Sequence, residues 1–293
     1  MGKVFVFGSL NMDLVINSPY LPQKGETMYG SGFMTNPGGK GANQAAAAGK
    51  LGAEIYMGGA VGDDSFGAQL LDNLRGFGVN VDAVRVVKNC ATGIAVIVVI
   101  DGDNRIILDG GANNRVTRAD VDRLLEKAEA GDIFLCPLEN PIPVLGYALE
   151  TAGRKGMYVV LNPAPMNRDI APYLPYVDML IPNETEFAAL VGDKLAEGGE
   201  KLMAMGVKDV VVTLGAKGYC YISKGEMVCE DCIKMPVVDT TAAGDTFCGA
   251  LCAELSMGKT VAQALSFANR AAAVTVTRKG AQAAIPTREE IQL

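Results

Sequence analysis

The segment at residues 237–250 carries the side chain best suited to acid–base chemistry. It reads VVDTTAAGDTFCGA, so apolar residues lead in, small residues turn the chain and an amphipathic helix follows. The amides of Ala242, Ala243 and Gly244 would lack acceptors at this helix start and can bind an anion. Asp245 lies beside them, where the positive end of the helix dipole favours an ionised carboxylate. Asp245 is therefore a candidate base, although an acid in a first turn more often only stabilises its helix.

The absence of histidine narrows the choice of base. The 293-residue chain contains no His and seven Cys. Ser-His-Asp and Cys-His catalysis are therefore excluded, which leaves a carboxylate, Lys, Tyr or Cys. A zinc site at Cys229 and Cys232 is disfavoured because no second ligand pair accompanies them. Without an export signal, we expect reduced thiols in a cytoplasmic protein, with these two cysteines on a β-hairpin.

A glycine-rich segment at residues 35–45, TNPGGKGANQA, offers groups for a polar ligand. Gly39 and Gly41 let backbone come close to a ligand, and Lys40 and Asn43 supply donors that suit sugar hydroxyls. A tight strand-to-helix turn with a solvated lysine would also explain the segment. It is not a dinucleotide fingerprint, because Gln44 occupies the third glycine position.

Polar residues also follow the first predicted strand. Asn11 and Asp13 alternate along an extended chain and so point the same way, at the strand edge where α/β proteins bind ligands. Turn chemistry would explain either residue. Asn183 and Glu186 share one helical face and could hold a hydrated Mg²⁺, or form a capping box.

Two later segments complete the candidate binding groups. Residues 212–218, VTLGAKG, turn tightly out of a strand and are shaped to let a base or phosphate approach backbone. Residues 273–282 end a long helix and by themselves read as helix-end chemistry. Residues 258–260, GKT, do not complete a P-loop because Ala253 replaces its first glycine.

The elements that position these groups alternate between strands and helices. Strands are expected at 4–7, 55–58, 132–136, 157–161, 178–181 and 210–214. Helices are expected at 42–51, 65–77, 117–129, 143–155, 184–191, 199–205, 243–256 and 261–278. This alternation predicts a three-layer α/β/α fold with a central, mostly parallel sheet.

Two stretches break the alternation, at about 10–35 and 93–109. Both read as antiparallel strands with turns, and Asp101-Gly102 is a good hairpin signal. No linker separates them from the rest, so we expect one domain over residues 1–293 with a small β-sheet lid. A net charge of −7 argues against nucleic-acid and membrane-surface partners, which require a basic face.

Taken in order, these segments resemble the ribokinase family of carbohydrate kinases, also called the phosphofructokinase-B type. The resemblance runs almost end to end. It rests on GGKGAN at 38–43, NPAP at 162–165, PNETE at 182–186, DTTAAGDTF at 239–247 and TRKGAQ at 277–282. Five ordered matches are far more specific than any one glycine motif.

The resemblance implies a role for each matching position. Asp245 corresponds to the general base, and the Ala242–Gly244 amides to an anion hole for the transferred phosphoryl group. Sugar-binding positions are matched by Asn11, Asp13, Gly39, Lys40, Gly41, Asn43 and Glu139. ATP-binding positions are matched by Asn183, Thr213, Leu214, Gly215, Ala216, Lys217, Gly218, Gly244 and Asn269. Glu186 corresponds to a Mg²⁺ position, and a K⁺ site is matched by Asp239, Thr241, Thr275, Arg278, Gly280 and Ala284.

The same resemblance implies the reaction and its alternatives. D-Ribose phosphorylated at its 5-hydroxyl by ATP is the leading expectation, because the whole sugar-binding set is present. Deoxyribose, a ketohexose or a nucleoside are alternative substrates. A sugar-binding sensor without catalysis and a structural oligomer that uses its lid sheet are further alternatives. A homodimer formed through the lid sheet is expected.

Overall fold

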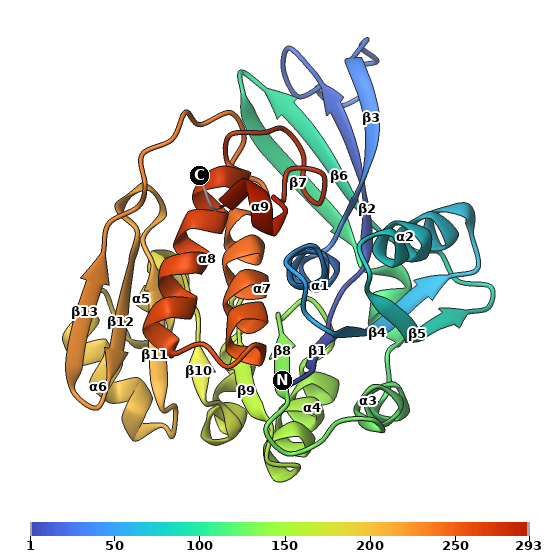
Figure 1. The fold of residues 1–293 in the computed structure, drawn as a ribbon. Coiled ribbons are helices and arrows are strands. Elements are labelled where there is room, and N and C mark those ends of the chain that lie inside the picture. The colour runs from blue at the N-terminus through green and yellow to red at the C-terminus, as the bar shows by residue number, and fades with distance from the viewer. Residues whose placement is uncertain (1, 292–293) are drawn as a thin grey trace.

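The computed structural model describes residues 2–291, and its main body is a nine-stranded sheet between two layers of helices (Figure 1). The order is β13-β12-β11-β10-β9-β8-β1-β4-β5, parallel from β5 to β11 and antiparallel at the β12–β13 edge. The strands are β1 (Val4–Phe7), β4 (Ile55–Gly62), β5 (Asn80–Val87), β8 (Ile133–Cys136), β9 (Tyr158–Leu161), β10 (Met179–Leu180), β11 (Asp209–Thr213), β12 (Tyr219–Ser223) and β13 (Glu226–Glu230). The expected three-layer α/β/α class is confirmed.

Side chains of the central strands alternate between the two helical layers. On β1, Val4 and Val6 join one buried cluster while Phe5 and Phe7 join the other, as a period of two requires. The first cluster is covered by α1 (Lys40–Lys50), α2 (Ser65–Gly76), α7 (Ala243–Ser256), α8 (Val261–Thr275) and α9 (Arg288–Ile291). The second is covered by α3 (Arg118–Leu125), α4 (Ile142–Arg154), α5 (Glu184–Val191) and α6 (Leu195–Ala204). Short 3-10 turns are η1 (Gly111–Arg115), η2 (Arg168–Tyr176) and η3 (Gly215–Lys217).

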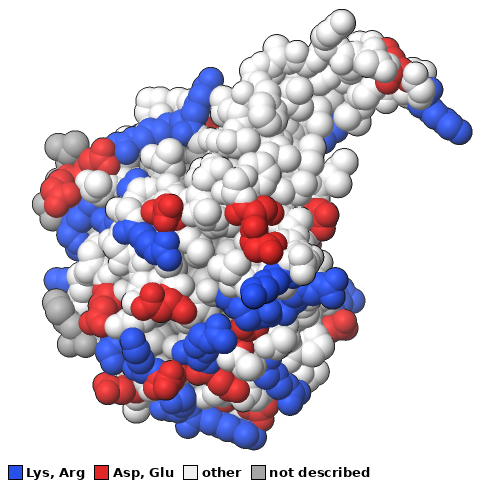
Figure 2. Space-filling view, turned by 90° about the vertical axis from the view of Figure 1, so that its right-hand side faces the viewer, with Lys and Arg blue, Asp and Glu red and all other residues white. Residues whose placement is uncertain are grey.

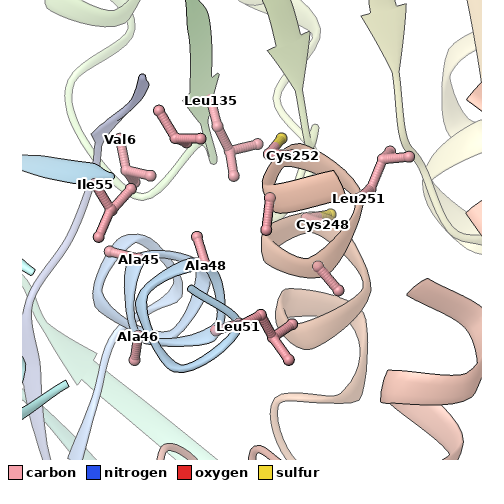
Figure 3. Close-up of a cluster of buried hydrophobic side chains, with 14 of the residues drawn as sticks. Val6, Ala45, Ala46, Ala48, Leu51, Ile55, Leu135, Cys248, Leu251 and Cys252 are labelled. Carbon is pink, nitrogen blue, oxygen red and sulfur yellow. The ribbon is translucent and has the colours of Figure 1, made fainter. Parts of the chain in front are cut away.

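Helices α1 and α7 lie close together beneath the sheet (Figure 3). The residues at this contact are small. Ala47 and Ala48 of α1 are fully buried, and Gly249 of α7 lies against them. A Cβ atom at Gly249 would lie 2.4 Å from the carbonyl oxygen of Gln44. The packing therefore places the N-terminal turns of α1 and α7, which both carry candidate site residues, beside each other.

A second, four-stranded sheet stands off the main body (Figures 1 and 2). Its order is β3 (Ser31–Gly38), β2 (Asn11–Asn17), β6 (Gly93–Ile100) and β7 (Asp103–Asp109). Its strands come from the two stretches in which the sequence predicted a lid. The β6–β7 turn has positive φ at Asp101 (52°) and Gly102 (83°), as the Asp-Gly signal predicted.

Several expected element ends were wrong by a few residues. The helix expected at 199–205 begins at Leu195, because Gly198 and Gly199 lie inside it. Added Cβ atoms there would come within 2.5 Å of Phe187 and 2.9 Å of Ile222, so these glycines serve close packing and do not mark a helix start. The helix expected to reach 278 ends at Thr275.

The expectation of reduced thiols was wrong for two cysteines. Cys220 and Cys229 face each other on β12 and β13 and form a disulfide bond, with Cα atoms 4.1 Å apart. Cys232 lies beyond the end of β13 and is a free thiol, so Cys229 and Cys232 are not a pair on one hairpin. Between residues 2 and 291, no helix combines the length and the apolarity that a bilayer crossing demands.

Candidate active site

Asp245 lies in the first turn of α7 and is only 7% exposed. Both of its carboxylate oxygens accept hydrogen bonds from amides of α1. Asn43 Nδ2 donates to Oδ2 at 2.9 Å, and Gln44 Nε2 donates to Oδ1 at 3.0 Å. The carboxylate is therefore held in one orientation by two neutral donors.

The turn before Asp245 exposes the start of α7. Ala242 is the N-cap residue, with a left-handed φ of 61° and no side-chain cap. The Ala243 amide donates to the Thr240 carbonyl at 3.3 Å, so it is not wholly free as the sequence suggested. An added Cβ at Gly244 would have open space around it, so a ligand can approach that part of the turn.

Lys40 is the first residue of α1 and lines the same cavity as Asp245. Its pKa is raised chiefly by the negative charge of Asp245, against the lowering effect of burial. The Lys40 amide donates to Glu139 Oε2 at 3.0 Å, and the Ser9 hydroxyl donates to the same oxygen. Gly39 has a φ of 89°, and a Cβ there would lie 2.7 Å from the Asn11 amide, so glycine is required at this turn.

The expected sugar-binding carboxylates lie near Asp245. Burial, followed by the charges of Glu139 and Asp245, raises the pKa of Asp13 from 3.8 to about 7. Asn11 and Glu139 line a neighbouring cavity of about 320 Å³. Asn11 is held by Asn113, whose Nδ2 donates to its Oδ1 at 2.7 Å. The sequence-predicted sugar set is thus brought to one place, beside the carboxylate of Asp245.

Two connected hollows extend from Asp245. A cavity of about 230 Å³ is lined by Lys40, Asn162, Ala164, Ile181, Asn183, Glu186, Thr213, Thr240, Ala242, Ala243, Gly244, Asp245 and Cys248. A larger cleft of about 590 Å³ shares Asn183, Thr213, Thr240, Ala243 and Gly244 with it. An elongated ligand can therefore lie in the cleft with one end at Asp245.

Most of the expected nucleotide positions line this larger cleft. They are Asn183, Thr213, Gly215, Ala216, Gly218, Gly244 and Asn269. Val237, Phe247 and Val276 add an apolar wall. Leu214 and Lys217 are outside the lining, and Lys217 pairs with Glu184 at 3.3 Å on the surface.

Asn183 and Glu186 form the capping box that was one of the two expectations for them. The Asn183 amide donates to Glu186 Oε2 at 2.9 Å, and the Glu186 amide donates to Asn183 Oδ1 at 2.8 Å. Burial raises the pKa of Glu186, with Asp245 adding to it. Its other carboxylate oxygen remains for a cation in the cavity shared with Asp245, so this residue fits a water-mediated Mg²⁺ position.

The expected K⁺ residues are only partly drawn together. Asp239 accepts from the Thr241 amide and hydroxyl and from the Gly280 amide, at 2.9, 2.6 and 3.0 Å. Thr275 is buried, and its hydroxyl is occupied by a bond to the Ala271 carbonyl. The Arg278 guanidinium forms an ion pair with Glu290. Ala284, six residues further along the chain, is buried. Within residues 2–291 no cluster of His, Cys, Asp and Glu suits a metal ion.

Several site residues could not be identified from the sequence. Gln44 served there only to reject a dinucleotide fingerprint, yet it binds Asp245. Ser9 binds Glu139 across 130 positions, and Asn162 binds Gln44 across 118. The NPAP run at 162–165 was the one available signal for Asn162.

Comparisons with known proteins agree with this geometry. Residues 1–288 match the family model described as pfkB family carbohydrate kinase. A ribokinase of Schizosaccharomyces pombe is 39% identical over 99% of this chain and 97% of its own, and one of Bacillus subtilis is 38% identical over 100% and 99%. The structure of Arabidopsis thaliana ribokinase complexed with ribose and ATP superposes with a TM-score of 0.91 at 34% identity, covering 100% of this chain and 98% of the other.

Proposed function

Because the chain belongs to the pfkB family of carbohydrate kinases, we propose that it transfers the γ-phosphate of ATP to the 5-hydroxyl of D-ribose, giving D-ribose 5-phosphate and ADP. One observation carries this proposal. The Asp245 carboxylate is fixed by Asn43 and Gln44 where a set of sugar-binding candidates meets a long cleft.

The reaction follows from these positions. Asp245 accepts the proton of the sugar hydroxyl while that oxygen bonds to the γ-phosphorus, and the bond from phosphorus to the ADP oxygen breaks. Phosphoryl transfer depends mainly on alignment and on charge stabilisation. The Gly244 region at the start of α7 and the Lys40 ammonium supply positive potential to the transferred group.

Selection of the sugar is assigned to the polar groups opposite α7. Asn11, Asp13, Lys40, Asn43 and Glu139 offer hydrogen-bond donors and acceptors at several angles, which matches a ligand with a hydroxyl on most carbons. Binding of ribose and ATP by the Arabidopsis relative supports this choice of ligands. Asn11 and Glu139 also line the adjoining cavity, which supports their assignment to the end of the sugar furthest from Asp245.

Two cations belong to the proposal. Mg²⁺ would be held through water by Glu186 and would neutralise phosphate charge beside the cleft. K⁺ would be held at Asp239, Thr241, Thr275, Arg278, Gly280 and Ala284, mostly by backbone oxygens, and would stiffen the turn before α7. The hydrogen bonds from Thr241 and Gly280 to Asp239 support this second site, because they already tie two of its segments together.

The small sheet is assigned as a lid and as a dimer contact. The exposed surface of this sheet includes Phe33, Met34, Ile106, Ile107 and Leu108, and Tyr29 lies in the loop between β2 and β3, each at least 51% exposed. In Figure 2 this sheet projects from the body, and the visible part of it carries few charged side chains below its tip. Exposed apolar surface of this kind marks a protein contact. We assign a second copy of the chain as the partner.

A cytoplasmic location is also part of the proposal, in line with the sequence expectation. Disulfide bonds are seldom kept in reducing compartments, so the Cys220–Cys229 bond would be unusual there. Cell fractionation tests the location. The protein should be recovered in the cytoplasmic fraction, and recovery outside the cell would contradict the location.

A panel of sugars with coupled detection of ADP tests the substrate. D-Ribose should give the highest kcat/KM, above 2-deoxyribose, D-fructose and adenosine. Equal or better turnover of another sugar would replace ribose by that sugar. A binding protein without catalysis would bind sugars and release no ADP, and this outcome would contradict the kinase assignment altogether.

A further inference from the structure

A chain of neutral side-chain amides leads to one oxygen of Asp245. Asn73 Nδ2, on α2, donates to Gln282 Oε1 at 2.6 Å, and Gln282 Nε2 donates to Asn43 Oδ1 at 3.1 Å. Asn43 Nδ2 then donates to Asp245 Oδ2 at 2.9 Å. Since each amide accepts at one atom and donates at another, every link orients the next.

A second amide chain ends on the other oxygen of the same carboxylate. Gln44 Nε2 donates both to Asp245 Oδ1 at 3.0 Å and to Asn162 Oδ1 at 3.1 Å. Asn162 Nδ2 donates to the Ile181 carbonyl at 2.8 Å. This second chain anchors Gln44 to the end of β10, in the main sheet.

Gln44 occupies its position at an energetic cost. Its side chain is fully buried, and its Oε1 atom has no hydrogen-bond partner among residues 2–291. Leaving a buried acceptor unpaired is unfavourable, because the atom gives up its hydrogen bonds to water and gains none in the fold. An apolar side chain of similar length would avoid that cost, but it would leave Asp245 Oδ1 and Asn162 Oδ1 without this donor, so the contribution of Gln44 lies in its Nε2.

We propose that Gln44 and Gln282 are positioning residues that hold the two oxygens of Asp245 in the orientation in which the carboxylate receives the sugar proton. Gln44 acts directly on Oδ1, and Gln282 acts on Oδ2 through Asn43. Gln282 lies two residues after Gly280, whose amide donates to Asp239. Residues 280–282 therefore contact Asp239 and, through Asn43, the base. This inference rests on the proposed function of Asp245.

Neutral donors suit this task because several charged groups already surround the Asp245 carboxylate. Asp245 interacts with the charges of Lys40, Asp13 and Glu186, which come from three different elements. It also lies near the thiol of Cys248, whose pKa is raised chiefly by burial. A further ammonium would stabilise the carboxylate and weaken it as a base, and a further carboxylate would repel it. An amide donor stabilises the charged carboxylate and adds no net charge.

The test compares Gln44→Met, Gln44→Glu and Gln282→Met with Gln69→Met, which alters an exposed position on α2. Gln44→Met should lower kcat 10- to 100-fold, with the dissociation constant for ribose within threefold of the parent value. The acidic limb of the kcat–pH profile should move to higher pH, and further in Gln44→Glu, where a carboxylate faces Asp245. Gln282→Met should lower kcat three- to tenfold. Gln69→Met should match the parent protein.

These outcomes separate positioning from packing. Loss of packing alone would lower thermal stability, leave the pH limb in place and spare the isosteric Gln44→Glu variant, and this pattern would overturn the proposal. A kcat within twofold of the parent value in both methionine variants would also overturn it.

A measurement that does not depend on turnover tests the Gln282 link even if the protein is not a kinase. In substrate-free protein, the side-chain amide protons of Asn43 should exchange with solvent at least tenfold faster in Gln282→Met, as followed by ¹⁵N NMR. Unchanged exchange would refute the Gln282 link, even if the protein phosphorylates no sugar.

Discussion

At the level of side chains, the site concentrates carboxylates that repel one another. Asp13, Glu139 and Asp245 face a common region, and Lys40 is the cation among them. The cost appears at Asp13, whose pKa is raised to about 7. A polyhydroxyl ligand that donates hydrogen bonds to these oxygens would relieve the cost, so the unliganded site is prepared for such a ligand.

The pH dependence of stability should reveal this cost. Because the pKa of Asp13 rises from 3.8 to about 7 on folding, its stabilising contribution is present below 3.8 and is lost as pH rises through 7. Asp13→Asn removes this loss, so the free energy of unfolding of the variant should rise relative to that of the parent above pH 4. The difference should reach at most about 4 kcal/mol above pH 8. Urea denaturation at several pH values measures the difference.

The matched control is Asp103→Asn, at an exposed position in the same small sheet. It should leave the dependence of unfolding free energy on pH unchanged. If Asp13→Asn and the parent protein show parallel curves from pH 4 to pH 8, the burial and repulsion ascribed to Asp13 are wrong.

The sequence predicted those site residues that occur in short motifs with a chemical meaning. Asp245 follows an anion-binding turn, and Lys40 and Asn43 follow two glycines, so type and spacing pointed to them. Gln44 and Gln282 could not be found in this way. Their hydrogen bonds join positions 201 and 239 apart, and a local pattern carries no information about partners at such separations.

At the level of helices and strands, the site depends on how closely α1 approaches α7. Both helices contribute their first turns to the cavity at Asp245. Small residues along the contact, including Ala47 and Gly249, set their separation. A change in that separation would move Asn43 and Gln44 away from Asp245.

Gly249→Ala tests this dependence. An added methyl would lie 2.4 Å from the Gln44 carbonyl and 2.6 Å from Ala47 Cβ, so the helices must move apart. We expect a loss of about 1–3 kcal/mol in stability by chemical denaturation. We also expect at least a tenfold fall in kcat, because misplacement of reacting groups is costly.

Gly76→Ala is the control for this change. Gly76 ends α2, and an added Cβ there has no neighbour within 4 Å. This variant should equal the parent protein in kcat and match or slightly exceed it in stability. A Gly249→Ala protein with full activity would show that the α1–α7 separation does not govern the base.

Elements were easier to predict than their ends. The helix starting at Ala243 was foreseen from its apolar periodicity and the turn before it. The start of α6 was placed at Gly199, whereas in the fold Gly198 and Gly199 lie inside the helix and accommodate Phe187 and Ile222. Helix ends depend on such tertiary contacts, which periodicity does not encode.

For the molecule as a whole, the two sheets differ in how much of their surface is buried. The central strands of the nine-stranded sheet bury their side chains on both faces, while the small sheet leaves apolar side chains on its surface. The sequence predicted the hairpin at Asp101-Gly102 and the two β-rich stretches. It could not predict that β2 and β6 pair in parallel over seven positions, because the register between distant strands is set by the tertiary fold.

The exposed apolar surface should decide the oligomeric state. Phe33→Glu and Ile107→Glu each place a charge on the small sheet, at side chains 65% and 70% exposed. Analytical ultracentrifugation should show a dimer for the parent protein and a monomer for both variants at micromolar concentration. Val228→Glu, 63% exposed on β13, should stay dimeric. A parent protein that sediments as a monomer would contradict the dimer assignment.

The role of Asp245 is tested most directly by single-turnover phosphoryl transfer from ATP to D-ribose in Asp245→Asn. The amide keeps the size of the side chain but accepts no proton, so the rate should fall by at least 10²-fold, in keeping with the contribution of a general base. Ribose binding by calorimetry should stay within about tenfold of the parent value. A transfer rate within threefold of the parent protein would show that Asp245 is not the base.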